Sequence, residues 1–299
     1  MRRRFFVMFN PGAGKSRRAL LDDVVARLHA AGASVTWCQA TDASAARDEA
    51  AGHICAGACD AVIAAGGDGT IRQAASVVAN TDMPLGFVPL GTGNVLAHEV
   101  GLDRAPDALA DTLLNGPLLP IECARANGEL FVLMAGAGFD GHVMAALKSA
   151  TKLRIGKAAY VAPVLASLAR PLDQLQVTVD GTARDATWTV IANARHYGGG
   201  FVIAPGTSLR ETGLHAVLFR SRSRVVLLRQ LLALGMGTLR DAGHDTGDVS
   251  MIPCRHVSVR STVPVACQID GDTFGATPLD VSYDGGTVQL IVPTRGVAV

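Results

Sequence analysis

Apolar and polar positions in the first 115 or so residues alternate between two spacings. Short apolar runs, typical of strands, are each followed by segments with apolar residues three or four positions apart, typical of helices. The expected strands are Phe5–Asn10, Ser34–Gln39, Ala61–Ala65 and Leu85–Pro89, and the expected helices are Arg17–Ala31, Ala43–Gly57, Thr70–Ala79, Val95–Val100 and Ala105–Leu114. This alternation predicts a parallel sheet covered by helices on both faces.

After Pro117 the pattern changes to strands joined by tight turns. Asn127-Gly128 and Asp180-Gly181 suit the positive φ angles of type I′ hairpin turns. The expected strands are Ile121–Ala126, Glu129–Ala135, Gln174–Val179, Thr182–Asn193, Leu214–Phe219, His256–Arg260, Val265–Asp270, Leu279–Tyr283 and Thr287–Pro293, with helices at Ile155–Leu168 and Ser223–Leu239. We therefore expect an α/β domain over residues 1–117 and a mainly antiparallel domain over 118–299. We leave open whether the last strand packs back toward the first domain.

Composition and charge narrow the class of protein. The formal net charge of +1 gives no reason to expect nucleic acid as a partner. No run of eighteen uncharged apolar residues occurs, so we expect no membrane-spanning helix. The apolar run after Arg2, Arg3 and Arg4 is too short for a signal peptide. The six cysteines form no CxxC motif, which fits a reducing cytoplasm.

Three glycine-rich loops follow three of the expected parallel strands. They are Asn10–Ser16, Gly66–Thr70 and Pro89–Asn94. The first ends in GKS, but Phe9 stands where a P-loop needs glycine, so it is not a Walker A motif. Ligands of such sheets bind beyond the carboxyl ends of the strands, and amides at helix starts attract anions. The plainer alternative for Gly66–Thr70 is a tight turn in which Asp68 caps the next helix.

The segments NPGAGKS, GGDGT and PLGTGN, in this order, resemble the catalytic domain of the diacylglycerol kinase and sphingosine kinase superfamily, above all its bacterial soluble lipid kinases. The resemblance continues through Gly136–Asp140, Ala204-Pro205 and Gln268–Asp272 and so covers nearly the whole chain. It implies a three-layer Rossmann-like domain, a C-terminal β-sandwich and a nucleotide site between them. The implied activity is ATP-dependent phosphorylation of a membrane-lipid hydroxyl, as in phospholipid biosynthesis.

The same resemblance implies which residues bind the nucleotide. The residues expected to contact ATP are Asn10, Pro11, Gly12, Ala13, Gly14, Thr41, Gly66, Gly67, Asp68, Gly69, Thr70, Thr92 and Asn94. Magnesium would arrive with the nucleotide, since Mg²⁺ keeps phosphate oxygens and waters as ligands. The family's further metal-supporting segment matches Ser208–Leu214, where only Glu211 and Thr212 remain as candidate metal ligands.

Asp270-Gly271-Asp272 ends an apolar strand and could supply the proton acceptor. On an extended chain the carboxylates of Asp270 and Asp272 would point the same way, and their proximity would raise one pKa. The alternative is a β-turn, because Asp-Gly is a common hairpin signal. The resemblance assigns Asp272 as the base, helped by Asp270, where relatives usually carry glutamate. Asp68 would position the metal ion or the lipid hydroxyl.

Gly136–Gly141 also fits the dinucleotide-binding pattern GxGxxG. The strand before it belongs to a hairpin, and no acidic residue follows at the distance that a ribose contact requires. We therefore do not expect a dinucleotide site. Within the segment Gly136–Gly141, we expect Asp140 either to support catalysis or to cap a helix.

The basic and apolar segment Ser223–Leu239 suits either an interfacial helix or burial against the second domain. The leading hypothesis is a lipid kinase acting at the inner face of the membrane, with a homodimer left open. Its acceptor could be diacylglycerol, a sphingoid base, ceramide or a glycerophospholipid. The alternatives are an NAD kinase-like enzyme, or a nucleotide- or lipid-sensing regulator with weak catalysis.

Overall fold

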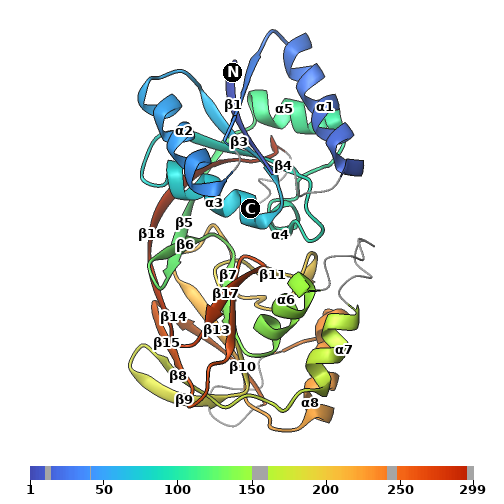
Figure 1. Cartoon of the computed structure of the whole chain (residues 1–299), viewed down its shortest axis with the longest axis vertical. Coiled ribbons are helices and arrows are strands. Elements are labelled where there is room, and N and C mark those ends of the chain that lie inside the picture. The colour runs from blue at the N-terminus through green and yellow to red at the C-terminus, as the bar shows by residue number, and fades with distance from the viewer. Residues whose placement is uncertain (11–14, 41, 150–160, 241–247, 295–299) are drawn as a thin grey trace. The chain divides into compact units, whose positions relative to one another are not determined.

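The computed structural model describes residues 1–10, 15–40, 42–149, 161–240 and 248–294. The chain divides into two compact units (Figure 1). Unit 1 consists of Met1–Glu122 and the chain from Gly286 on, and unit 2 consists of Cys123–Gly285. Strands β5 (Leu118–Ala126) and β18 (Leu279–Ile291) both continue across the boundary between the units.

Unit 1 is built on a parallel sheet, as the alternating pattern predicted. Its strands β1 (Arg4–Phe9), β2 (Ser34–Trp37), β3 (Ala61–Gly66) and β4 (Pro84–Pro89) lie in the order β2-β1-β3-β4. The end of β18 adds a further parallel strand beside β4. β3 is buried along its whole length, which explains why its sequence is uniformly apolar or small.

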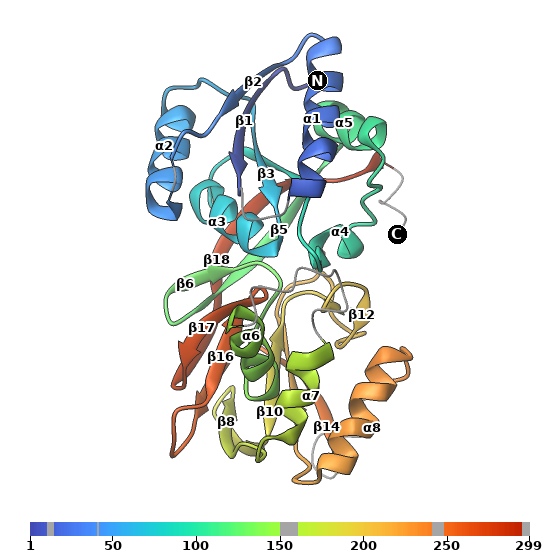
Figure 2. The same cartoon turned by 45° about the vertical axis from the view of Figure 1, so that its right-hand side comes forward.

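Helices cover both faces of this sheet (Figure 2). They are α1 (Lys15–Ala30), α2 (Ala43–Cys55), α3 (Asp68–Val78), α4 (Val95–Glu99) and α5 (Pro106–Asn115). α1 packs against α5, and α2 packs against α3. Leu21 and Leu28 of α1, together with Leu109 of α5, share one core with Phe5 and Ile63 of the sheet. The three-layer Rossmann-like prediction is confirmed.

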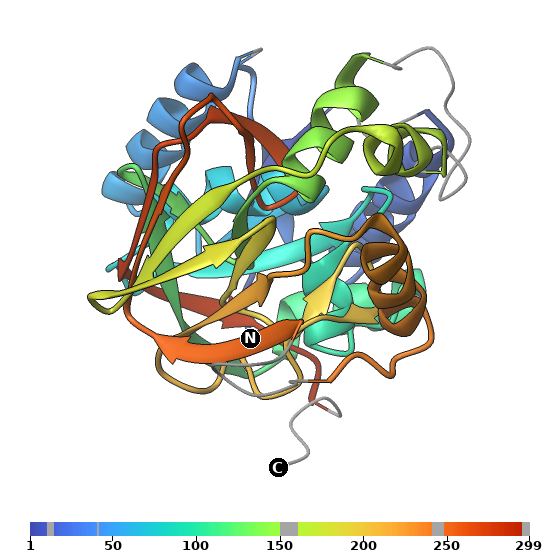
Figure 3. The ribbon, with the colours of Figure 1, turned by 90° about the horizontal axis from the view of Figure 1, so that it is seen from below.

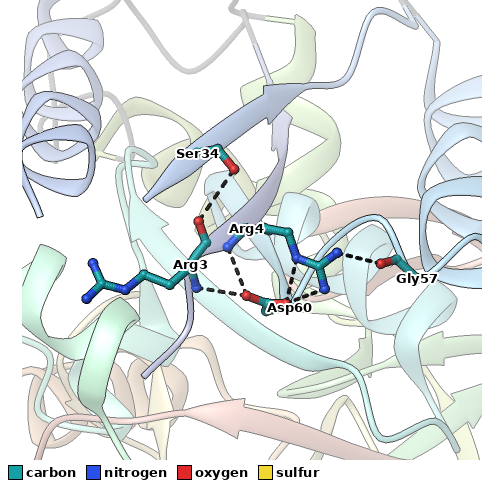
Figure 4. Close-up of polar contacts among 5 residues, drawn as sticks. All are labelled: Arg3, Arg4, Ser34, Gly57 and Asp60. Carbon is teal, nitrogen blue, oxygen red and sulfur yellow. Dashed lines mark hydrogen bonds and ion pairs between the residues drawn. The ribbon is translucent and has the colours of Figure 1, made fainter. Parts of the chain in front are cut away.

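A polar cluster joins the start of β1 to the chain before β3 (Figure 4). The Asp60 carboxylate accepts hydrogen bonds from the backbone N–H groups of Arg3 and Arg4, and from Nε and Nη2 of Arg4. Arg4 Nη1 also donates to the carbonyl of Gly57. Arg4 therefore anchors the start of β1 to the chain before β3, although it is part of the basic cluster Arg2–Arg4 at the N-terminus.

Unit 2 consists mainly of two antiparallel sheets around a common core, which confirms the β-sandwich. One sheet has the order β14-β13-β10-β7-β16-β17, and the other contains β18-β15-β8-β9 and the pair β5–β6. The bounds are β6 (Glu129–Phe131), β7 (Met134–Ala137), β8 (Leu175–Val179), β9 (Thr182–Ala186), β10 (Trp188–Ala192), β11 (His196–Tyr197), β12 (Phe201–Val202), β13 (Leu214–Phe219), β14 (Val249–Cys254), β15 (His256–Arg260), β16 (Ala266–Ile269) and β17 (Asp272–Ala276). Ile191 and Leu218 from the first sheet share the core with Val177, Val259 and Val281 from the second.

Two long strands expected in unit 2 are each divided. Glu129–Ala135 separates into β6 and β7 around Val132 and Leu133, where the chain passes from one sheet to the other. Thr182–Asn193 divides at Thr187 for the same reason, and the Thr187 hydroxyl donates to the carbonyls of Phe219 and Ser221. Conversely, the two strands expected after Leu279 form the single strand β18.

Three helices of unit 2 are described: α6 (Phe139–Ser149), α7 (Val161–Ala169) and α8 (Arg224–Gly235). α6 packs against α7. On α8, Leu227 and Leu234 are buried, whereas Val225, Leu228 and Leu232 are exposed. Among the described residues, no helix is both long and apolar enough to span a bilayer.

Candidate active site

Three chain segments meet where β1, β3 and β4 end. The backbone N–H of Asn10, after β1, donates to the Ala65 carbonyl at 3.1 Å. The N–H groups of Leu90 and Gly91, after β4, donate to the Gly66 carbonyl at 2.7 and 3.0 Å. The second and third glycine loops and Asn10, which begins the first loop, therefore meet at one edge of the sheet, as parallel topology requires.

The second and third loops pack backbone against backbone. A Cβ added to Gly91 would lie 2.6 Å from the Cα of Gly67, which no ordinary packing allows. A Cβ on Gly66 would lie 2.1 Å from the Thr70 hydroxyl oxygen. These glycines are therefore needed for the close approach of the two loops, and their contact holds the GGDGT and PLGTGN segments together.

Asp68 occupies the first turn of α3 but caps a different helix. Its Oδ2 accepts from the N–H of Val95 at 3.0 Å, and its Oδ1 accepts from Leu96 at 3.2 Å. Asn94, the N-cap residue of α4, makes no capping hydrogen bond of its own. The alternative in which Asp68 caps the helix beginning beside it is wrong, because Gly67 is the N-cap of α3 and the carboxylate accepts from N–H groups of α4.

Asn94 is fully buried and adopts a left-handed conformation with φ of 48°. Its Nδ2 donates to the Gly91 carbonyl at 2.7 Å, whereas its buried Oδ1 has no hydrogen-bond partner among the described residues. A buried acceptor without a donor costs free energy. The closely packed glycine loops and this unsatisfied oxygen fit a site for a polar ligand.

The remaining predicted nucleotide contacts fall into two groups. Thr92 is half-buried in the third loop, and Asn10 is exposed at the end of β1. The others lie outside the described residues: Pro11, Gly12, Ala13, Gly14 and Thr41.

The acidic pair of unit 2 does not lie on an extended strand. Asp270 and Gly271 form the turn between β16 and β17, with φ of 47° and 79°. Asp270 is 4% exposed, whereas Asp272 is exposed on the opposite arm of the hairpin, in register with Ile269. The expectation that the two carboxylates point the same way is therefore wrong, since the chain reverses between them.

Asp270 instead binds backbone far away in the sequence. Its Oδ2 accepts from Val132 at 2.9 Å, and its Oδ1 accepts from Leu133 and Met134 at 2.8 and 3.0 Å. Val132 and Leu133 form the break between β6 and β7, and Met134 is the first residue of β7. Asp270 thus holds the hairpin turn against the crossing point of the two sheets.

Asp140 and Gln268 form a second buried polar link to this turn. Gln268 Nε2 donates to Asp140 Oδ2 at 3.0 Å, and Gln268 Oε1 accepts from the Gly271 N–H at 2.9 Å. Burial raises the pKa of Asp140 to about 6, and hydrogen bonds from Gln268 and Gly141 offset part of that effect. Sequence reasoning singled out Asp140 and included Gln268 in a segment that resembles the family, but it gave Gln268 no role.

The glycines of the GxGxxG segment allow close backbone packing. Gly138 and Gly141 adjoin the backbone of Thr187 and Ala266, respectively, where a Cβ would clash.

The candidate metal ligands stay predictions. Glu211 and Thr212 are exposed in the loop before β13. Within the described part of the chain, no group of three or more His, Cys, Asp or Glu side chains could hold a metal ion.

Comparison with known proteins matches both units. The family described as the diacylglycerol kinase catalytic domain matches residues 4–126. The family described as the YegS C-terminal NAD kinase beta sandwich-like domain matches residues 134–292. A protein named diacylglycerol kinase from Mycobacterium tuberculosis is 33% identical over 285 residues, covering 91% of this chain and 89% of its own. The chain belongs to the diacylglycerol kinase family.

Other members of this lipid kinase family support the assignment. A "probable lipid kinase YegS-like" protein from Pseudomonas fluorescens is 35% identical over 234 residues, covering 75% of this chain and 73% of its own. The crystal structure of "a putative diacylglycerol kinase" from Bacillus anthracis has a TM-score of 0.78 at 18% identity and covers 99% of both chains, so it shows the same fold. The second family description names an NAD kinase-like β-sandwich and applies to residues 134–292.

Proposed function

We propose that this lipid kinase transfers the γ-phosphoryl group of ATP to the hydroxyl of diacylglycerol or a related membrane lipid. The observation that carries the proposal is the packing of GGDGT against PLGTGN through Gly67 and Gly91. This packing brings backbone amides and the start of α3 to one edge of the sheet. Amides at a helix start stabilise the charge of a triphosphate.

Phosphoryl transfer depends mostly on positioning and on neutralising charge. We assign phosphate binding to Asn10–Gly14 and Gly66–Thr70, with Thr41, Thr92 and Asn94 nearby. The unsatisfied Asn94 Oδ1 supports a polar ligand at these loops. Mg²⁺, bound with the nucleotide, would neutralise phosphate charge during transfer.

Asp272 is our candidate for the base that accepts the proton of the lipid hydroxyl. Asp272 is exposed, whereas Asp270 binds three backbone N–H groups, so we now assign Asp270 to positioning the turn. Asp68 likewise positions the third loop through α4. Glu211 and Thr212 remain candidates for a supporting metal ion.

The acceptor is presented at a membrane, and we place the reaction at its cytoplasmic face. The exposed apolar side chains of Val225, Leu228 and Leu232 on α8 support a peripheral contact with lipid.

The deciding experiment follows transfer of radiolabelled γ-phosphate to a panel of diacylglycerol, ceramide, a sphingoid base and a glycerophospholipid, with NAD as a further acceptor. We expect a labelled lipid in the wild type and none in Asp272→Ala. Asp284→Ala removes another exposed aspartate of unit 2 and should keep full activity. Labelled NAD would support the NAD kinase alternative, and no labelled product would support a regulator. Full activity of Asp272→Ala would refute the base assignment.

A further inference from the structure

Unit 2 contains a pocket of about 400 Å³ that none of the residues assigned above lines. It lies at the ends of β8, β9, β13 and β15, and Figure 3 shows the β8–β9 hairpin and α8 from below. Its volume lies in the range of small-molecule sites. Asp185, Gln176 and Arg260 lie in register across three neighbouring strands and form one row of its lining.

Three arginines, Arg220, Arg222 and Arg260, bring positive charge to the lining of this pocket. Arg260 is held by Asp280, with Nη1–Oδ1 and Nη2–Oδ2 distances of 3.0 Å. Arg220 and Arg222 lie on the segment that leads from β13 to α8, and within the described residues neither side chain forms an ion pair. Arg220 Nη1 is buried and has no hydrogen-bond partner there. A buried guanidinium nitrogen without an acceptor costs free energy that a bound anion would offset.

We propose that this pocket binds a phosphate ester whose alcohol part carries hydroxyl groups, such as a glycerol phosphate group. Guanidinium groups bind phosphate oxygens through paired, charge-assisted hydrogen bonds. Gln174 and Gln176 in the lining offer partners for hydroxyl groups, and the Asp185 carboxylate can accept from them. The ligand is either the headgroup of a phospholipid in a bilayer or a soluble phosphate ester.

The test measures binding of glycerol 3-phosphate by calorimetry in the presence of saturating non-hydrolysable ATP analogue, so that any site at the glycine loops is occupied. Arg222→Gln and Arg220→Gln should each weaken binding by about tenfold to a hundredfold, the usual effect of a lost charge-assisted hydrogen bond. Arg224→Gln is the matched control. It removes the same charge from an exposed arginine two positions away that does not line the pocket.

A second arm distinguishes the two sources of ligand. Sedimentation with phosphatidylcholine vesicles, with and without phosphatidylglycerol, should show a loss of binding in Arg222→Gln if the ligand is a lipid headgroup. Unchanged vesicle binding, together with weaker binding of glycerol 3-phosphate, would identify a soluble ester. Equal effects of Arg222→Gln and Arg224→Gln in both arms, or no binding by the wild type, would overturn the proposal. Because no step depends on phosphoryl transfer, the result stands whether or not the kinase assay succeeds. Arg222 is exposed, so its variant should fold even if Arg220→Gln does not.

Discussion

Replacing Asp68 by alanine should destabilise unit 1, because this carboxylate caps α4 from outside the helix. The substitution leaves two backbone donors, the N–H groups of Val95 and Leu96, without their acceptor. Val95 and Leu96 are 6% and 0% exposed, so little water can replace the carboxylate. Hydrogen bonds to charged groups contribute about 1.5–3 kcal/mol each, and partial relaxation reduces the sum. We expect a loss of about 3 kcal/mol for Asp68→Ala and about half of that for Asp68→Asn, which keeps one acceptor oxygen.

The two tryptophans of the chain allow unit 1 to be observed separately. Trp37 lies on β2 of unit 1 and Trp188 on β10 of unit 2. In a Trp188→Phe background, urea unfolding followed by fluorescence reports on unit 1. The matched control is Asp103→Ala, which removes an exposed carboxylate that accepts from the Ala105 N–H at 2.9 Å. A single exposed hydrogen bond of this kind contributes about 1 kcal/mol.

Comparing the Asp68 variants with this control separates the loss of buried helix capping from the loss of one exposed hydrogen bond. An Asp68→Ala protein that unfolds within about 0.5 kcal/mol of its parent would refute the capping argument. An Asp68→Asn protein that is stable but inactive in the kinase assay would show that the carboxylate also acts on the metal ion or the substrate. Loss of stability and activity in proportion would indicate a structural role alone.

Three further predictions concern unit 2. Because burial raises the pKa of Asp140 from 3.8 to about 6, the folded state binds more protons than the unfolded state between these values. The stability of the wild type relative to Asp140→Asn should therefore fall by about 2 kcal/mol as pH rises from about 4 to 6 in urea unfolding followed by circular dichroism, and a constant difference would contradict the assignment. Asp270→Asn keeps one acceptor for three N–H groups and should cost about 2–4 kcal/mol in the same measurement, so a loss under 1 kcal/mol would count against its anchoring role. Leu232→Ser on α8 should weaken sedimentation with anionic vesicles without lowering stability, whereas equal sedimentation would remove α8 from the proposed contact.

Local patterns predicted the architecture because they reflect short-range physics. The alternation of apolar runs and helical spacing specified the layers of unit 1, and the Asn-Gly and Asp-Gly turns specified hairpins in unit 2. β14 and β17 were missed. β14 contains Pro253, and β17 has the sequence DTFGA, in which polar residues and glycine hide any alternation.

The roles of the acidic residues depend on contacts that no local pattern encodes. Asp270 binds N–H groups 136 to 138 positions earlier in the chain, and Asp68 binds N–H groups 27 and 28 positions later. The sequence motifs correctly placed the second and third glycine loops at one sheet edge. They suggested helix capping for Asp68 and Asp140, but they could not indicate which distant backbone groups the carboxylates bind.

The acids of the recognised motifs therefore separate into two kinds. Asp68, Asp140 and Asp270 each direct carboxylate oxygens at backbone N–H groups or at Gln268, and Asp140 and Asp270 are almost entirely buried. Asp68 and Asp270 therefore bind backbone groups, whereas Asp140, whose pKa burial raises to about 6, is shielded from solvent and bound to Gln268. Asp272 differs because it is exposed, and two buried links, through Asp270 and through Gln268, hold the turn that precedes it. This contrast makes Asp272 the first residue to replace in the search for the base.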